Sequence, residues 1–249
     1  MTNLLVSADQ VFDYALTFFW EPNNDGQPPH TTPGDSGGLT SWGVTYGLWV
    51  SWQKSHRQPY SVAMFQAQTK DDFKPLYRLW FFNAARCDAL GIIGIPVFDM
   101  AANAGPSEAV KILQKVVGVE QDGSVGPITL AAVAGVEQSV LLESYTLNRI
   151  AYYRSLNEPE FIHGWTNRAN ACQAYTAGLI AGSSDPTPSA SPSPAPVASP
   201  VSVSTVTGTL SALNTSSSES SNQETPTADD LNQESLSGEF SGGLSNTNC

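Results

Sequence analysis

The feature that most constrains the fold of this 249-residue chain is a sharp change in composition after residue 182. All six Trp and all 11 Lys and Arg residues lie at or before Arg168. From residue 183 the chain is rich in Ser, Thr and Pro, and Phe240 is its only aromatic residue. Such a segment cannot bury enough apolar surface to offset the entropy lost on ordering. We therefore predict a folded part over residues 1–182 and a disordered acidic tail over residues 183–249.

The charge of the chain argues against nucleic acid as its partner. Sixteen acidic and 11 basic residues give the first part a net charge of −5, and seven acidic residues give the tail −7. A total of −12 repels a polyanion, because binding to nucleic acid rests on basic side chains that neutralise phosphates.

The sequence indicates no metal, no cofactor and no disulfide framework. The three cysteines, Cys87, Cys172 and Cys249, are an odd number, and neither they nor the three histidines have the spacing of metal ligands. The N-terminus lacks the basic and apolar regions of a signal peptide, and no window contains 18 consecutive apolar residues. We expect a soluble chain that is made in the cytoplasm and does not insert into a membrane.

An amphipathic helix is predicted near the N-terminus, and an acidic residue follows it. Ser7 and Gln10 match the capping-box pattern that starts a helix. The apolar residues that one helical face can then bury are Val11, Phe12, Ala15, Leu16, Phe18 and Phe19. Glu21 stands at the end of this rigid element beside Trp20, where partial desolvation would favour the protonated form that a general acid needs. An ordinary exposed Glu at a helix end fits the same pattern.

A Gly- and Pro-rich loop after Glu21 offers a second carboxylate and a hydroxyl. Asp35 and Thr40 are separated by Ser-Gly-Gly-Leu, and the glycines allow a sharp turn and a close approach to a ligand. Hydrolysis of a glycosidic bond needs a protonated carboxyl that assists the leaving oxygen. It also needs a carboxylate that activates water or stabilises the developing oxocarbenium ion. Glu21 and Asp35 can supply these groups, and Thr40 can orient the water.

These residues resemble the signature of glycoside hydrolase family 108, the lysozyme-like N-acetylmuramidases of bacteria and their phages. The signature comprises Glu21, the loop from Asp35 to Thr40, and the following Trp-Gly-Val-Thr at residues 42–45. Further blocks keep the family's order between about residues 5 and 180; they are residues 75–81, 97–106, 114, 121–129 and 161–168. Two features depart from the family. Ser36 replaces the usual Pro, and residues 26–33 lengthen the interval between the two acids.

The resemblance implies a mainly α fold, a lysozyme-like domain of two helical lobes. Residues 1–92 would form the catalytic lobe, and residues 93–182 would form a lobe with a peptidoglycan-binding-like block. That block would either bind the wall or only complete the cleft. Local periodicity and end signals predict further helices at residues 46–52, 71–82, 96–104, 106–118, 127–135 and 140–157, and from residue 164 onward.

The resemblance also implies the reaction. Glu21 would protonate the leaving oxygen of the β-1,4 bond between N-acetylmuramic acid and N-acetylglucosamine. Asp35 would activate water or stabilise positive charge, and Thr40 would position the water. Two alternatives remain open: a lytic transglycosylase, and a non-catalytic peptidoglycan-binding or export accessory protein.

The resemblance further implies residues that bind the substrate. Trp42 and Tyr46 would stack on sugar rings, although aromatic residues in small helical domains more often belong to the core. Asn103 would bind substrate or merely end a helix before Gly105. The partner is then the glycan strand of peptidoglycan. A chain without a signal peptide would need a holin-like partner to act in the periplasm or at the cell wall.

Overall fold

Helices dominate the computed structural model, which describes residues 6–21, 27–31 and 38–182. The α-helices are α1 (Ala8–Phe19), α2 (Tyr46–Ser55), α3 (Val62–Gln66), α4 (Lys74–Tyr77), α5 (Gly94–Ala104), α6 (Pro106–Val117), α7 (Pro127–Ala134), α8 (Gln138–Ser155) and α9 (Ile162–Ile180). Short 3-10 turns are η1 (Lys70–Phe73), η3 (Cys87–Ala89) and η4 (Gly91–Ile93), and η2 (Arg78–Phe82) is a π-helical turn. The prediction of a mainly α fold is confirmed. The predicted tail lies outside the described residues, and the boundary between residues 92 and 93 stays a prediction.

The ends of the helices follow from local sequence. Ser7 caps α1, since its hydroxyl accepts the N–H of Gln10 while the Gln10 side chain accepts the N–H of Ser7, as the capping-box pattern predicts. The six apolar residues predicted to face the core from α1 are all buried. Helix α6 begins at Pro106 and ends before Gly118, whose φ of 74° is the left-handed conformation that glycine adopts at helix ends.

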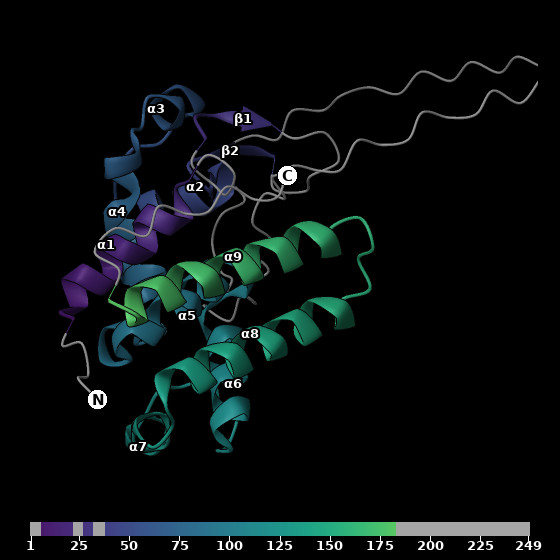
Figure 1. Cartoon of the computed structure of the whole chain (residues 1–249). Helices are drawn as coiled ribbons and strands as arrows, with labels where there is room; N and C mark the ends of the chain where they lie inside the picture. The colour runs from purple at the N-terminus through teal and green to yellow at the C-terminus, as the bar shows by residue number, and fades with distance from the viewer. Residues whose placement is uncertain (1–5, 22–26, 32–37, 183–249) are drawn as a thin grey trace, which may run out of the picture. The chain divides into compact units, whose positions relative to one another are not determined.

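The central element is α5, which packs against α1, α6, α8 and α9. Its residues from Gly94 to Ala102 are all buried, which is expected of a helical stretch in which every residue except Asp99 is apolar. Figure 1 shows α8 and α9 as a long pair that lies side by side. Gly94 starts α5 where a Cβ atom would lie only 2.5 Å from the carbonyl oxygen of Cys87, so the approach of α5 to η3 requires glycine.

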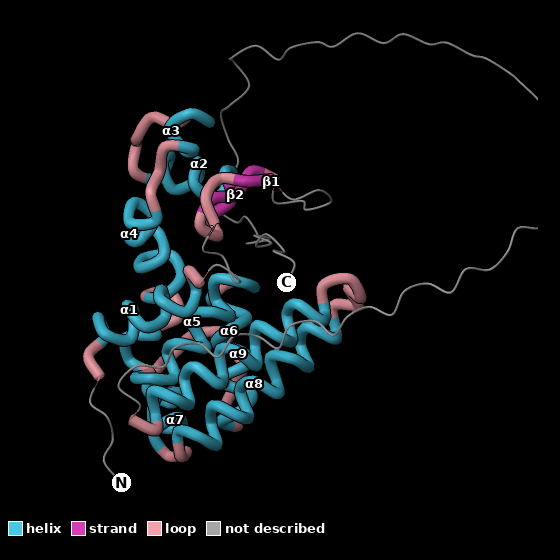
Figure 2. Tube along the Cα trace, turned by 45° about the horizontal axis from the view of Figure 1, so that its top comes forward, coloured by secondary structure: helices cyan, strands magenta, loops and turns pink. Residues whose placement is uncertain are grey.

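A small antiparallel sheet lies between α1 and α2 in the chain. Its strands β1 (His30–Thr31), β2 (Leu39–Ser41) and β3 (Val44–Thr45) lie in the order β1-β2-β3. Figure 2 shows β1 and β2 beside α2, with the bundle of α5, α6, α8 and α9 in another part of the same fold. Thr45 caps α2 directly after β3, because its hydroxyl accepts the N–H of Leu48. Within the described part of the chain, no helix is both long and apolar enough to span a bilayer.

Candidate active site

Glu21 lies immediately beyond the end of α1 and is half-buried. The helix ends at Phe19, and Trp20 is its C-cap, with an N–H that donates to the carbonyl oxygen of Leu16 at 2.9 Å. The N–H of Glu21 donates to the Phe18 carbonyl oxygen at 3.2 Å. These bonds fix the backbone of Glu21 relative to the helix, so the acid is attached to a rigid element as the sequence predicts.

The start of α1 is also tied down. The Arg78 guanidinium pairs with Asp9 at 2.6 Å and lies over the rings of Phe12 and Phe82, 4.7 and 4.9 Å from their centroids. Asp9 is exposed, so the ion pair itself adds little, whereas the stacking on two rings fixes η2 against the helix. The position of Glu21 therefore depends on contacts at both ends of α1.

The strands β2 and β3 form a hairpin with a two-residue turn, Trp42-Gly43. Both residues have positive φ, 51° and 80°, as in the type I′ turns that match the twist of a hairpin. Gly43 adopts this conformation readily, but a Trp in it costs conformational energy that the surroundings must offset. Sequence reasoning missed this turn, because its usual signal is Asn-Gly or Asp-Gly rather than Trp-Gly.

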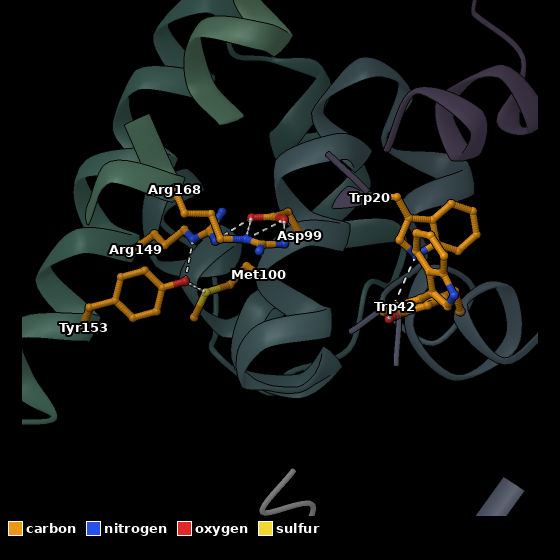
Figure 3. Close-up of polar contacts among 8 residues, drawn as sticks. Trp20, Trp42, Asp99, Met100, Arg149, Tyr153 and Arg168 are labelled. Atoms are coloured by element: carbon orange, nitrogen blue, oxygen red, sulfur yellow. Dashed lines mark hydrogen bonds and ion pairs between the residues drawn. The ribbon is translucent and has the colours of Figure 1, made fainter. Parts of the chain in front are cut away.

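Hydrogen bonds to the backbone of Trp42 offset the cost of this conformation. Its N–H donates to the Gln27 carbonyl oxygen at 2.7 Å. Its carbonyl oxygen accepts the indole N–H of Trp20 at 3.3 Å and the hydroxyl of Tyr77 at 2.8 Å. Figure 3 shows the indole of Trp20 against Trp42. The residue before Glu21 is thus bonded directly to the tip of the signature hairpin.

Thr40 lies in the central strand of this hairpin and is buried. It pairs with His30 of β1 and with Thr45 of β3, and its hydroxyl donates to the Gly38 carbonyl oxygen at 3.3 Å. Asp35, the predicted second carboxylate, lies outside the described residues. Glu21 follows α1, and Thr40 lies in β2. The hydrogen bond between Trp20 and Trp42 joins α1 to the hairpin that contains β2.

The predicted sugar-binding residues have other contacts in this structure. Trp42 and Tyr46 are half-buried and pack on the edge of the core. The ring of Tyr46 lies 5.5 Å from that of Phe65 and 6.2 Å from that of Trp49. Asn103 is half-buried in the last turn of α5, ahead of Gly105, which has a φ of 90° and ends the helix.

Tyr175 of α9 is a neighbour of Glu21 that sequence reasoning missed. Its ring packs on Phe18 with centroids 5.5 Å apart, and only 5% of the residue is exposed. Burial raises the pKa of Tyr175 to about 12, and the negative charges of Tyr14, Cys172 and Glu21 add to this rise. A neutral phenol therefore lies near the candidate acid at neutral pH. The buried face of α9 could have suggested Tyr175, but no local pattern points to Glu21 as its neighbour.

A buried ionic cluster lies behind the end of α1. Asp99 of α5 accepts hydrogen bonds from Arg149 of α8 at 2.6 Å and from Arg168 of α9 at 2.7 Å. Arg149 also donates to the hydroxyl of Tyr153 at 2.8 Å (Figure 3). The Arg168 guanidinium lies 4.8 Å from the ring centroid of Phe19, two residues before Glu21. Arg168 therefore supports the last turn of α1 from the side of the helical bundle.

The charges in this cluster are strongly coupled. Burial alone would raise the pKa of Asp99, but the positive charges of Arg168 and Arg149 outweigh it and hold the pKa below the ordinary value. Two guanidinium groups share one carboxylate, so the cluster keeps a net positive charge in the core. Across the described ranges, no group of three or more His, Cys, Asp or Glu side chains gathers in a way that would hold a metal ion.

A second polar cluster organises the turn before α7. The buried amide of Gln114 donates to Asp122 at 2.6 Å and to the carbonyl oxygen of Ser124 at 3.0 Å, and its oxygen accepts the N–H of Gly123 at 2.8 Å. A longer bond of 3.3 Å reaches the hydroxyl of Thr129. Gln114 and residues 121–129 of the predicted signature therefore stabilise the conformation of the loop before α7.

Two family models match adjacent stretches of the chain. The model described as Glycosyl hydrolase 108 matches residues 26–105, and the one described as Predicted Peptidoglycan domain matches residues 108–170. The first match contains the hairpin with Thr40 and Trp42. Glu21 lies just before it, and Tyr175 lies just after the second match.

Known structures and curated proteins give different results. Twelve chains of solved structures match. One of them, SagA from Brucella abortus, is 30% identical; the match covers 71% of this chain and 98% of that one, with a TM-score of 0.61. The comparison with curated proteins gave no match. The identity to SagA over nearly its whole length and the two adjacent family matches show that this chain belongs to glycosyl hydrolase family 108, a family of peptidoglycan-active hydrolases.

Proposed function

We propose that this protein is an N-acetylmuramidase, and that it hydrolyses the β-1,4 bond between N-acetylmuramic acid and N-acetylglucosamine in peptidoglycan. The observation that carries this proposal is the position of Glu21. In a member of a glycosyl hydrolase family, this acid follows a helix that is tied at both ends, and the residue before it is bonded to the hairpin of the family match. General acid catalysis requires a carboxyl held in such a fixed place.

In the proposed reaction, Glu21 donates its proton to the glycosidic oxygen as the bond from that oxygen to the anomeric carbon breaks. A water molecule then forms a new bond to the anomeric carbon and gives up a proton. Asp35 accepts that proton, or stabilises the positive charge that develops at the anomeric carbon, and Thr40 orients the water. A separation of about 6.5–9.5 Å between the two carboxyl groups leads to inversion, and about 5 Å leads to retention.

The role of Glu21 is tested by the Glu21→Gln variant with purified peptidoglycan as substrate. The release of reducing ends should fall by about 100-fold or more, because general acid catalysis contributes roughly 10²–10⁴-fold to such rates. Glu120→Gln is the matched control, since Glu120 is exposed and lies in the loop after α6. Equal rates for the wild-type protein and Glu21→Gln would contradict the proposal and would leave a non-catalytic binding or accessory role.

The products distinguish hydrolysis from transglycosylation. A muramidase adds one water to the cleaved bond, so mass spectrometry of the digest should show muramic products with a free reducing end. An anhydro-muramic product would instead identify a lytic transglycosylase, which shares the acid but closes a ring within the sugar.

We also propose that the protein acts at the cell wall after leaving the cytoplasm with the help of a holin-like partner. The proposal predicts that co-expression with a holin greatly increases lysis of a host that makes the protein internally. Equal lysis with and without the holin would contradict it.

A further inference from the structure

Three aromatic rings form a stack at the C-terminal end of α2. The rings of Trp52 and His56 lie 3.9 Å apart between centroids, and Trp80 of η2 meets Trp52 edge to face at 5.4 Å. The two Trp residues are half-buried, whereas His56 is exposed. A hydrogen bond of 2.9 Å from Nδ1 of His56 to the Trp52 carbonyl oxygen holds the imidazole in this stack. Half-exposed aromatic rings in fixed positions provide apolar area at low entropic cost when a ligand binds.

The same end of α2 is locally positive, although the chain as a whole is acidic. The chain carries a net charge of −12, yet residues 36–70 contain no Asp or Glu. Lys54, His56 and Arg57 lie within four positions there, and all three are exposed. Lys54 also extends over the exposed ring of Tyr60, with its ammonium 5.6 Å from the ring centroid. Local positive charge beside aromatic rings suits a ligand that carries both carboxylates and sugar rings.

Arg57 occupies a backbone position that glycine usually fills. Its φ is 55°, and the N–H of Gln58 donates back to the carbonyl oxygen of Gln53 at 2.9 Å, as in the motif that closes many helices. The left-handed conformation strains a residue with a Cβ atom, and glycine would avoid this strain. This closing motif fixes the backbone of Arg57 at the C-terminal end of α2, directly after His56.

The stack rests on the elements that position the candidate active site. Helix α2 begins at Tyr46, directly after the hairpin, and Trp52 follows six residues later, which corresponds to about 9 Å along a helix. Trp80 lies one helical turn after Tyr77, whose hydroxyl holds the Trp42 carbonyl oxygen. A polymeric substrate that reaches the hairpin therefore has this second surface within a short distance.

We propose that Trp52, Lys54, His56, Arg57 and Trp80, here called the α2 ledge, bind the glycan strand of peptidoglycan outside the catalytic centre. The two indoles contact sugar rings, while Lys54 and Arg57 pair with the carboxylates of stem peptides. The inference rests on the proposed function, because it takes the same polymer as ligand. It explains how a chain with a large negative charge holds an anionic wall polymer: the contact is local and positive.

The binding test uses the full-length chain with Glu21→Gln, so that the polymer is not consumed. In this background, Lys54→Ala with Arg57→Ala should weaken co-sedimentation with purified sacculi by about tenfold. The matched control is Lys115→Ala with Arg154→Ala, which removes the same charge from exposed positions on α6 and α8 and should leave binding unchanged. Equal binding by the ledge variant and the control variant would overturn the inference.

Two further measurements identify the contacts. Converting the carboxylates of the sacculi to amides, with a carbodiimide and ammonium chloride, should reduce the difference between ledge variant and control, because their negative charge is then gone. A difference that stays the same size would overturn the pairing with carboxylates. Trp52→Phe keeps an aromatic ring of smaller area and should bind more weakly than the parent chain, whereas unchanged binding would exclude the indole as a contact.

An activity measurement separates this inference from the proposed function. In chains that keep Glu21, the ledge variant should lower the ratio of turnover on whole sacculi to turnover on short soluble glycans by about tenfold. If the wild-type chain cuts neither substrate, the proposed function fails, yet the binding difference in the Glu21→Gln background still supports the ledge. If both substrates are cut with an unchanged ratio, the ledge fails and the proposed function stands.

Discussion

The indole N–H of Trp20 donates to the carbonyl oxygen of Trp42 at 3.3 Å, across 22 positions of the chain. This bond connects the C-cap of α1 with the turn of the signature hairpin, and the hydroxyl of Tyr77 donates to the same oxygen. One backbone oxygen thus joins the helix that ends before Glu21, the hairpin and α4. The distance between the acid and the hairpin is set by a backbone atom rather than by a pair of reactive side chains.

Replacing the indole tests this connection. Trp20→Phe keeps a ring but loses the donor, so we expect stability to fall by about 1 kcal/mol. Activity on peptidoglycan should fall about tenfold, because small displacements of catalytic groups are costly. Denaturant unfolding and a turbidity assay measure the two effects.

A double-mutant cycle with Tyr77→Phe shows whether the two donors act as a unit. Tyr77→Phe removes the second donor to the same oxygen, so the two substitutions should not be additive. Additive effects on activity would show that the shared oxygen does not position the acid.

A titration of Tyr175 tests whether Glu21 lies close to it. Because the negative charge of Glu21 contributes to the raised pKa of about 12 at Tyr175, Glu21→Gln should lower that pKa. Ultraviolet titration of the phenols measures it, and Tyr175→Phe identifies the signal by its loss. Asp13→Asn is the control, since Asp13 is an exposed acid on the same helix. An identical Tyr175 pKa in the wild type and Glu21→Gln would show that the two groups are not neighbours.

Asp99→Asn should be strongly destabilising at neutral pH. It leaves two buried guanidinium groups without their carboxylate, and the loss of one partner from a buried pair costs about 3–5 kcal/mol. Denaturant unfolding at pH 7 measures this loss. The exposed pair of Asp88 with Arg86, 3.6 Å apart, gives the control: Asp88→Asn should change stability by less than about 1 kcal/mol.

The same variant predicts a pH dependence. The pKa of Asp99 is lower in the folded than in the unfolded chain, so its contribution is complete above the unfolded value of about 4. This contribution to stability is lost as the pH falls through the pKa of Asp99 in the folded chain. The difference in stability between the wild type and Asp99→Asn should therefore shrink below about pH 4. A constant difference from pH 7 to pH 3 would show that the pKa of Asp99 is the same in the folded and the unfolded chain, and would contradict the prediction.

The Gln114 cluster predicts a third effect on stability. Gln114→Leu has a similar volume but leaves the N–H of Gly123 without its acceptor, so we expect a loss of about 2 kcal/mol. Gln121→Leu in the exposed part of the same loop should be nearly neutral. If thermal unfolding shows the same small change for both variants, the buried amide does not organise the loop.

Local signals predicted most of the helices, because these signals lie within a few residues of one another. The capping box of Ser7 and Gln10 and the left-handed Gly118 lie where the sequence indicates. Residues 71–82 are helical as predicted, but the segment passes from a 3-10 turn through α4 to a π-turn. The N–H of Asn83 there donates to the Arg78 carbonyl oxygen. Such a change of helical register depends on packing and has no local signature.

The contacts around the candidate site could not be predicted, because they join distant parts of the chain. Asp99 lies 50 residues from Arg149 and 69 from Arg168, and periodicity shows only that Asp99 interrupts an apolar helix. The indole of Trp20 and the hydroxyl of Tyr77 both donate to the backbone carbonyl oxygen of Trp42. Because every residue has such an oxygen, no sequence pattern predicts these bonds. The roles of Glu21, Thr40 and Asp35 remain predictions that the experiments above test.

Asp99 also limits how this protein can have evolved. It lies in the stretch matched by the hydrolase model, while both of its arginine partners lie in the stretch matched by the peptidoglycan model. Recombination that joins either stretch to an unrelated neighbour leaves buried charges without counter-ions. A chimera made at residues 106–107 should therefore fail to fold unless the incoming segment brings matching charges.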